Sequence, residues 1–450
     1  MKSAGQVHGL SRFILAIRAT NCAADQSDFT LAARKQNLYP TPLTLVNHTI
    51  QYLQSDSAEQ GIEIGHLVNC ILLDSIGAGA SDIHIEPWES TLVVRIRLNG
   101  VLSELVHLPL DLMDKISGRL KVMASLISYQ TGLPQEGHAS AGPELGGVEL
   151  RISVFPTVRG EKIVIRLFDP SNRSFELSAL GFDDDTLKTF VGLLTRPSGL
   201  LLLTGPTGSG KTTAIYSALY HIVQRNGPAV SISTVEDPVE FNLPMISQAQ
   251  INPAQDFTYP KALRSLMRQD PQVIMVGEIR DPETAGIAVQ AGLTGHLVIS
   301  TIHSGIAAGV YARLINMDIE PFLLASSIIA VLGIRLVRKN CTFCTQAYQP
   351  EPGLLRSLPA DMVSTTEFRR GTGCGECMNT GFKGRSAVTE LLVSDEIFRD
   401  AVLQKMPTRA LQEVAIRQGM QTMWQNGLRR VTSGHTSLEE ILRVITMDQM

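Results

Sequence analysis

The chain has 450 residues, of which 44% are hydrophobic and 18% are charged, so it is neither a disordered protein nor one built on a single core. The formal net charge of −4 at pH 7 excludes an overall basic field that would attract nucleic acid or anionic lipid. The longest apolar segment, residues 321–333, is shorter than the ~18 residues that indicate a membrane span.

The N-terminal part of the chain predicts a small α+β domain. Residues 1–60 lack strong periodicity, and we expect a variable extension there. From residue 61 to residue 170 the apolar residues follow helical spacing at 62–76 and 112–126, and strand-like patterns at 81–87, 91–102, 148–155 and 161–168. Residues 171–180 follow, and their Pro, Asn and Ser content predicts a linker.

Beyond residue 181 strands and helices alternate, which predicts a mainly parallel sheet and an α/β domain over residues 181–450. An apolar strand leads into a glycine-rich loop, and a helical pattern follows it. The loop and the start of that helix read Gly205, Pro206, Thr207, Gly208, Ser209, Gly210, Lys211, Thr212 and Thr213. Such a loop wraps backbone N–H groups around phosphates at a helix N-terminus. We therefore predict an ATP site, with Lys211 on the β- and γ-phosphates and Thr212 on Mg²⁺.

Two carboxylates end apolar strands where a parallel sheet places its ligands. Glu236 lies in "VSISTVEDPVEF", and Glu278 follows the apolar residues 273–276. Strand-end carboxylates are often merely solvated, but the phosphate loop favours a role for both in binding Mg²⁺ or activating water. His296 and His303 flank a third strand, 297–301. Alone they indicate helix-capping or core residues, whereas beside a phosphate loop His303 could sense the γ-phosphate.

The cysteine spacing predicts a metal site. Cys341 and Cys344 form one CxxC pair, Cys374 and Cys377 form another, and 29 residues separate the pairs. The sequence lacks a recognisable export signal, so we expect a cytoplasmic protein with reduced thiols. Four thiolates in this arrangement suit a closed, structural Zn²⁺ site.

At this point the sequence resembles the secretion-superfamily ATPases, the motors of type II secretion and type IV pilus assembly. The resemblance covers roughly residues 62–450. It is carried by the motifs "ASDIHIEP", the phosphate loop, "TVEDPVEF", "RQDPQVIMVGEIRDPETA", "TGHLVISTIHS" and "GMQTMWQNGLRRVTSGHTSLEEILRV".

The resemblance implies roles for individual residues. Glu278 would be the catalytic glutamate, and Glu236 would help to position Mg²⁺ and water. His296 and His303 would couple the nucleotide state to movement. Three arginines would carry phosphate-facing or coupling roles: Arg151, Arg166 and Arg335.

The resemblance also implies an architecture and partners. A PAS-like module would precede a RecA-like ATPase domain that includes a tetracysteine zinc module over 338–385 and C-terminal helices over 386–450. Six copies would form a ring at the cytoplasmic face of the inner membrane. The ring would drive a membrane platform protein and would associate with the membrane peripherally, through its partners.

The sequence departs from the family pattern at a few positions, which keeps alternatives open. His138 replaces an arginine, Gly305 and Ile306 replace polar residues, and Ile334 replaces a glutamine. A weakly hydrolysing ATP-binding ring scaffold is therefore the main alternative. A nucleic-acid motor is less favoured, because the chain has no basic, aromatic-rich stretch. The choice among secretion, pilus assembly and DNA uptake stays open.

Overall fold

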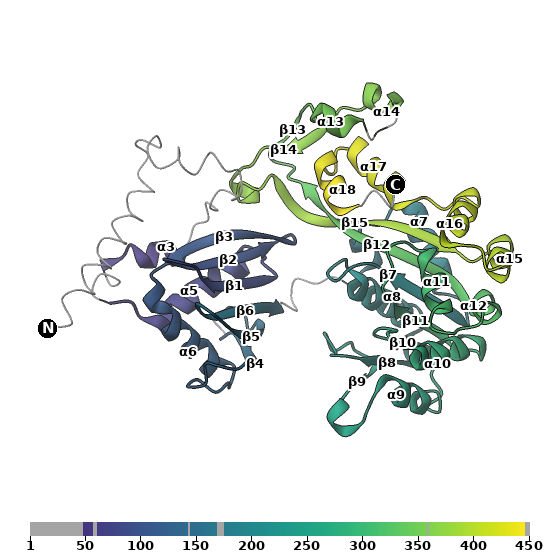
Figure 1. The fold of residues 1–450 in the computed structure, drawn as a ribbon, viewed down its shortest axis with the longest axis horizontal. Helices are drawn as coiled ribbons and strands as arrows, with labels where there is room; N and C mark the ends of the chain where they lie inside the picture. The colour runs from purple at the N-terminus through teal and green to yellow at the C-terminus, as the bar shows by residue number, and fades with distance from the viewer. Residues whose placement is uncertain are drawn as a thin grey trace. The chain divides into compact units, whose positions relative to one another are not determined.

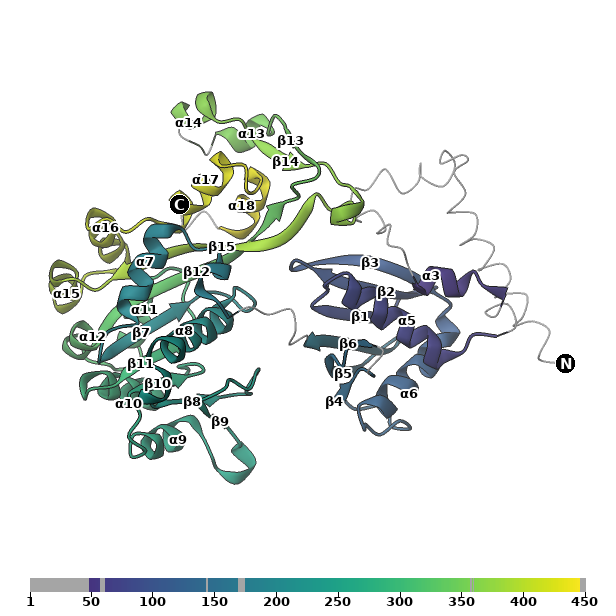
Figure 2. The same cartoon turned by 180° about the vertical axis from the view of Figure 1, so that it is seen from behind.

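Figure 1 shows the fold as a computed structural model, and Figure 2 shows it from behind. The structure describes residues 48–56, 61–142, 145–168, 175–356, 358 and 360–445. The chain divides into two compact units, the first built mainly of residues up to 173 and the second mainly of residues from 174 onward. Within the described residues, no helix combines the length and the apolar character needed to cross a membrane.

An antiparallel sheet of six strands forms the framework of the N-terminal unit, in the order β3-β2-β1-β6-β5-β4. The strands are β1 (Asp82–Pro87), β2 (Leu92–Leu98), β3 (Val101–Leu108), β4 (Gln135–Ser140), β5 (Glu149–Thr157) and β6 (Gly160–Phe168). The β2–β3 hairpin turns at Asn99 and Gly100, both of which have positive φ angles, as the Asn-Gly pair predicts.

Helices α3 (His48–Leu53), α5 (Ile64–Gly77) and α6 (Met113–Met123) share one apolar core with this sheet. Helix α3 corrects one expectation, because residues 48–53 belong to the packed unit and not to a variable extension. Leu53 is buried, and the buried Asp74 of α5 accepts hydrogen bonds from the backbone N–H groups of His48 and Thr49, both at 2.9 Å. Residues 1–47 and 57–60 lie outside the described part of the chain.

The larger unit is organised around a sheet of seven strands in the order β15-β12-β7-β11-β10-β8-β9. Its strands are parallel except for the β12–β15 pair, which confirms the predicted mainly parallel sheet. The strands are β7 (Gly199–Thr204), β8 (Ile232–Glu236), β9 (Ser247–Gln250), β10 (Val273–Val276), β11 (Leu297–Thr301), β12 (Ile328–Asn340) and β15 (Phe382–Val393).

Both faces of the large sheet are covered, which explains the unbroken apolar run at residues 200–203. Leu200 and Leu202 point into one core, and Leu201 and Leu203 point into the other. Successive side chains of a strand alternate between faces, so a strand covered on both sides must be apolar throughout. Strand β7, which leads into the phosphate loop, therefore lies in the middle layer of three, with a layer of helices on each face of the sheet.

Helices α7 (Asp184–Leu193) and α8 (Lys211–Asn226) contribute to one core of this unit. The other core receives α9 (Tyr259–Leu266), α10 (Pro282–Leu293), α11 (Gly309–Ile315), α12 (Pro321–Ser327), α15 (Glu396–Leu403) and α16 (Thr408–Arg417). Helices α17 (Met423–Thr432) and α18 (Leu438–Val444) close a smaller cluster. The segment of the chain that connects β12 to β15 contains four short elements: β13 (Thr345–Ala347), α13 (Pro352–Leu355), α14 (Ala360–Thr365) and β14 (Arg369–Gly371).

Two expected boundaries differ from the structure. Residues 386–393, which we expected in C-terminal helices, belong to strand β15, and their valine and leucine content suits a buried strand. Of the expected linker, residues 171–174 lie outside the described part, and residues 177–180 form a short 3₁₀ helix with Leu177 buried.

A buried ion pair in the N-terminal unit generates a stability prediction. The Lys121 Nζ lies 2.7 Å from a carboxylate oxygen of Glu161, with only 1% and 8% of the two side chains exposed, and Ser117 donates to the same carboxylate. Breaking such a pair leaves one buried charge without its partner.

We expect Lys121→Met to lower the free energy of unfolding of this unit by about 3–5 kcal/mol. The chain has two tryptophans, so Trp88 fluorescence in a Trp424→Phe background reports on this unit during urea denaturation. The double variant Lys121→Met/Glu161→Leu is the control and should recover most of the loss. Equal stability of the parent and Lys121→Met would contradict the interpretation.

Candidate active site and cysteine cluster

The phosphate loop joins β7 to α8 through residues 205–210, as predicted. Gly205, Gly208 and Gly210 all have positive φ angles, a backbone conformation that favours glycine. A Cβ atom at Gly205 would lie 2.5 Å from the carbonyl oxygen of Ile334, so a larger residue does not fit there. Helix α8 begins at Lys211, and its first N–H groups, including that of Thr212, have no partner within the helix.

Two polar groups of the loop are arranged for an anion. The Lys211 Nζ donates to the carbonyl oxygens of Gly205 and Pro206, at 2.7 and 2.9 Å. Burial lowers the pKa of Lys211, and the carboxylate of Glu278 opposes that shift. The buried Ser209 Oγ has no hydrogen-bond partner among the described residues. A cradle of free N–H groups, an ammonium group and an unsatisfied hydroxyl fits a phosphate chain.

Glu278 and His303 meet beside this loop. A carboxylate oxygen of Glu278 lies 3.0 Å from the His303 Nε2, and the other accepts a 2.7 Å hydrogen bond from the Arg280 Nε. The His303 Nδ1 lies 3.2 Å from the carbonyl oxygen of Gly205. The structure thus brings Glu278, His303 and the loop together.

His296 does not join this group. It precedes β11, at the end of the strand opposite to His303, and its Nδ1 lies 3.1 Å from the carbonyl oxygen of Ala291, at the end of α10. This contact is typical of a helix-capping histidine. Distance along the strand therefore separates His296 from the phosphate loop.

Glu236 ends β8, but its carboxylate is buried and fully engaged. Tyr216 donates to one oxygen, while Thr234 and Gln248 donate to the other at 2.5 and 3.0 Å. Only 3% of the residue is exposed. This environment favours an orienting carboxylate over one that is free to ligate an ion. The sequence showed no sign of the partners, since Tyr216 comes from α8 and Gln248 from β9.

Arg335 lies behind the phosphate loop and is buried. Its guanidinium donates to the backbone carbonyls of Ile334 and Gly305, both at 3.0 Å, and it would lie 3.1 Å from a Cβ at Gly205. Burial lowers its pKa, and Glu390 opposes that shift. In this arrangement Arg335 binds backbone carbonyls of β12 and of the segment after His303, next to the loop, rather than facing a phosphate.

Arg151 and Arg166 belong to the N-terminal sheet. A continuous cross-strand row joins Arg97, Asp82, Arg166, Arg151 and His138 on five neighbouring strands. Arg97 and Arg166 flank the carboxylate of Asp82, at 3.3 and 3.2 Å, whereas Arg151 pairs with Glu136 at 2.8 Å. Arg151 and Arg166 therefore share one polar face of this sheet with His138, the residue that replaces an arginine of the family pattern. Their roles toward a nucleotide stay predictions.

The sequence reasoning missed Arg280, which contacts Glu278 directly. The pairing raises the pKa of Arg280 and keeps the carboxylate beside a permanent positive charge. The signal was present in the sequence "GEIRD", where the arginine follows Glu278 by two residues.

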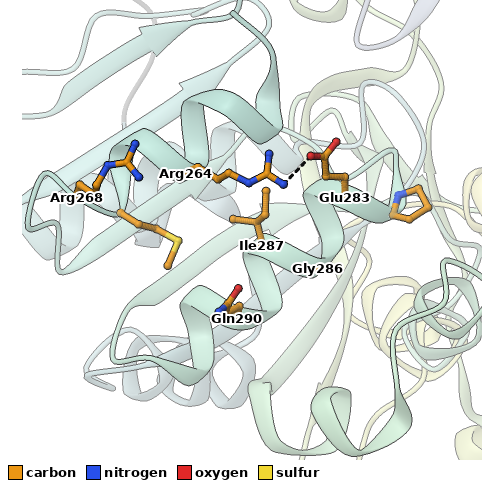
Figure 3. Close-up of a pocket in the computed structure, with 8 residues that line it drawn as sticks. Arg264, Arg268, Glu283, Gly286, Ile287 and Gln290 are labelled. Carbon is orange, nitrogen blue, oxygen red and sulfur yellow. Dashed lines mark ion pairs between the residues drawn. The ribbon is translucent and has the colours of Figure 1, made fainter.

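A shallow groove of about 690 Å³ lies elsewhere, between α9 and α10 (Figure 3). Arg264 and Glu283 pair across it at 2.7 Å, and Arg268, Ile287 and Gln290 also line it. None of the predicted site residues borders this groove. The candidate active site is instead defined by converging strand ends.

The four predicted metal-binding cysteines gather in one cluster. All four sulfur atoms lie within 4.8 Å of one another, and the Cys374 and Cys377 sulfurs are 3.7 Å apart. A tetrahedral Zn²⁺ with bonds of ~2.3 Å would separate its sulfurs by about 3.8 Å, so the cluster fits this ion. Cys70 lies apart, buried in α5, where burial raises the pKa of its thiol.

Comparisons with known proteins agree with this geometry. The family described as "Type II/IV secretion system protein" matches residues 57–443. The type IV pilus assembly ATPase PilB of Myxococcus xanthus is 43% identical over 382 residues, covering 84% of this chain and 67% of that protein. The type II secretion system ATPase E of Vibrio cholerae is 41% identical over 389 residues, covering 86% and 76%.

Two solved structures share the fold. The pilus retraction motor PilT with bound ADP is 25% identical, with a TM-score of 0.56, covering 84% of this chain and 96% of that one. The Legionella pneumophila ATPase DotB is 21% identical, with a TM-score of 0.61, covering 83% and 94%. Given its match over residues 57–443 and its identity to these relatives, this chain belongs to the type II/IV secretion system protein family.

Proposed function

We propose that this chain is an ATP-hydrolysing motor for assembling a type II secretion pseudopilus or a type IV pilus. One observation carries the proposal: Lys211, Glu278 and His303 converge at one edge of the large sheet. This is the arrangement that phosphate binding and water activation need. The names of the relatives, a pilus assembly ATPase and a secretion ATPase, support the choice of process.

The residues divide the chemistry among them. Backbone N–H groups of the phosphate loop and of the first turn of α8, together with the Lys211 ammonium, would bind the phosphates of ATP, and the Thr212 hydroxyl would hold Mg²⁺, which would offset the phosphate charge. Glu278 accepts the proton of the attacking water. His303, bonded to both Glu278 and the loop, senses whether a γ-phosphate is present. Glu236 orients this end of the sheet through Tyr216 and Thr234.

Substitutions at Lys211 and Glu278 separate binding from hydrolysis. Lys211→Ala should weaken ATP binding by about a hundredfold or more. It removes the charge-assisted contacts of the ammonium group with the β- and γ-phosphates, which contribute ~1.5–3 kcal/mol each. Glu278→Gln should bind ATP normally and lower kcat by about 10²-fold or more, because the general base is lost. Titration with a fluorescent ATP analogue and a steady-state phosphate-release assay measure the two effects.

Glu283→Gln is the matched control for Glu278→Gln. It makes the same chemical change on a more exposed carboxylate of α10 and should keep the parental kcat. A Glu278→Gln variant that turns over at the rate of this control would exclude Glu278 as the base. A parental protein without measurable turnover would leave the ATP-binding ring scaffold as the better function.

We further propose that the motor works as a homo-hexamer, in which the N-terminal unit is a PAS-like module. The exposed guanidinium of Arg166, with 58% of its side chain accessible, and the neighbouring Arg151 supply positive charge on the polar face of this module. An arginine that reaches a neighbour's nucleotide would stabilise the developing charge of the reaction.

This assembly predicts a concentration dependence. The specific ATPase activity should rise several-fold with protein concentration and then level off as rings form. Arg151→Ala should lower the plateau without changing the concentration at half-effect, whereas Arg159→Ala, in the turn at the far end of the β5–β6 hairpin, should behave like the parent. A monomer with constant specific activity in parallel sedimentation runs would refute the ring.

The ring would act at the cytoplasmic face of the inner membrane and bind it peripherally, through a membrane platform protein. This proposal relies on the secretion and pilus systems named for the relatives. Nucleic acid is not a proposed partner, because the net charge of −4 supplies no general attraction for it.

We propose Zn²⁺ as the ion of the four-cysteine cluster, in a structural role. Cys341, Cys344, Cys374 and Cys377 would supply four thiolates and leave no position open for water. The ion would hold the ends of the segment between β12 and β15 together.

Metal analysis of purified protein should find about one zinc per chain. Cys374→Ser should lose the metal and lower the melting temperature of the protein, because the site contributes folding free energy. Cys70→Ala is the control and should keep its zinc, since Cys70 lies in a helix of the N-terminal core. Freshly reduced parental protein without any bound metal would refute this site.

A further inference from the structure

Glu390 is a buried carboxylate that the proposed chemistry does not use. It lies on β15, with 1% of the residue exposed, and pairs across the sheet with Gly333 of β12. A Cβ atom at Gly333 would lie 2.7 Å from the Glu390 Cγ. The glycine therefore makes room for this acidic side chain within the sheet.

Hydrogen-bond donors surround the Glu390 carboxylate. Its Oε1 accepts a 2.6 Å hydrogen bond from the backbone N–H of Ala307, and the backbone N–H of Met423 and the side chain of Gln412 interact favourably with the charged carboxylate. Met423 is the first residue of α17, so its N–H has no partner within that helix. A carboxylate satisfies this group and interacts favourably with the positive end of the helix dipole.

The donors offset part of the cost of burying a charge. Burial raises the pKa of Glu390, whereas the N–H groups of Ala307 and Met423, the charge of Arg335 and the Gln412 side chain oppose that shift. Burying an acidic group in this way costs free energy, and its hydrogen bonds require specific directions of the donors. It therefore fixes the groups that donate to it.

One of those groups belongs to the segment that carries His303. Residues 304–308 follow His303 directly and are held from three strands. Thr204 of β7 bonds both the N–H and the carbonyl of Ser304, at 2.8 and 3.0 Å. Arg335 of β12 donates to the carbonyl of Gly305 at 3.0 Å, and Glu390 of β15 binds the N–H of Ala307.

The side chains of this segment contribute apolar packing and one local hydrogen bond. Ala307 and Ala308 are buried in the core, Ile306 packs against it, and the Ser304 Oγ donates to the carbonyl oxygen of Ile306. The backbone contacts add directional hydrogen bonds that help to fix the segment, and with it the imidazole that bridges Glu278 and the phosphate loop.

We propose that Glu390 is a positioning residue for ATP hydrolysis, which holds the 304–308 segment so that His303 stays between Glu278 and the phosphate loop. Through Met423 and Gln412 the same carboxylate ties this segment to the start of α17 and to α16. The inference rests on the proposed ATPase function. Glu390 would thereby connect α16 and α17 to the segment that positions His303.

The test compares three variants of the full chain. Glu390→Leu removes the acceptor, and Glu390→Gln keeps an oxygen that can accept from Ala307. Glu440→Leu is the matched control, because Glu440 is an equally buried carboxylate of the same unit that binds Arg338 and Arg443 and does not touch the 304–308 segment.

We expect Glu390→Leu to lower kcat about tenfold or more, the effect of losing one charge-assisted hydrogen bond, with KM for ATP within about twofold of the parent. Glu390→Gln should recover most of that rate, and Glu440→Leu should keep the parental kcat despite reduced stability. Hydrogen exchange at Ala307 should accelerate about tenfold or more in Glu390→Leu alone.

A Glu390→Leu protein with the kcat of Glu440→Leu, or with unchanged exchange at Ala307, would overturn the inference while leaving the ATPase function intact. A parent that does not hydrolyse ATP would instead refute the function, and the exchange measurement would still decide the role of Glu390. If Glu390→Leu does not fold, Gly333→Ala replaces it, because the added methyl displaces the carboxylate without removing it. It should slow kcat several-fold and accelerate the same exchange.

Discussion

The parallel alignment of β7, β11 and β10 is the constraint on which the candidate site depends. Val276 pairs with Ser300, and Ser300 pairs with Leu202, so these three residues lie level across the sheet. Glu278, His303 and the phosphate loop begin two or three residues further along each strand. At about 3.3 Å per residue, an offset of two or three residues places all of them close together at the same edge of the sheet. A slip of one residue in any strand would turn its side chains to the other face.

Buried polar contacts fix the groups at this edge. The Lys211 ammonium rests on two loop carbonyls, Arg335 supports the backbone behind them, and Glu236 is held by three donors. Each of these charges is costly to bury alone, and each has a specific partner. Such satisfied polar contacts favour one geometry over its near alternatives, because any displacement leaves a buried charge unpaired.

The parts of this site that the sequence predicted are those in which local pattern and geometry coincide. An apolar strand, a glycine-rich turn and a helix follow one another in the chain, so the phosphate loop was readable from residues 200–213. Glu278 and His303 were predicted for the same reason, since both follow apolar strands. The CxxC pairs likewise carry their own spacing, although the closeness of the two pairs depends on the fold.

Other features could not be predicted because their partners lie far away in the chain. The burial of Glu236 depends on Tyr216 and Gln248, which come from a helix and from an edge strand. A glutamate within the apolar run of β15 was a visible anomaly, but nothing near Glu390 in the sequence indicated Ala307 as its partner. The strand at residues 386–393 was missed because helical patterns follow it directly.

Strand β12 connects the phosphate loop to the cysteine cluster without a break. Its Gly333 pairs with Thr204 at the end of β7, and the strand then continues beside β15 as far as Asn340, one residue before Cys341. Beyond the sheet, α17 and α18 pack against this hairpin, and Arg338 of β12 binds Glu440 of α18. An ion held by both CxxC pairs would link the ends of β12 and β15 at the tip of this hairpin. The chain would then gain less conformational entropy if the two strands separated. With such an ion bound, the hairpin would be held at both ends: by Glu390 and Arg335 beside the candidate active site, and by the cysteines at the far end.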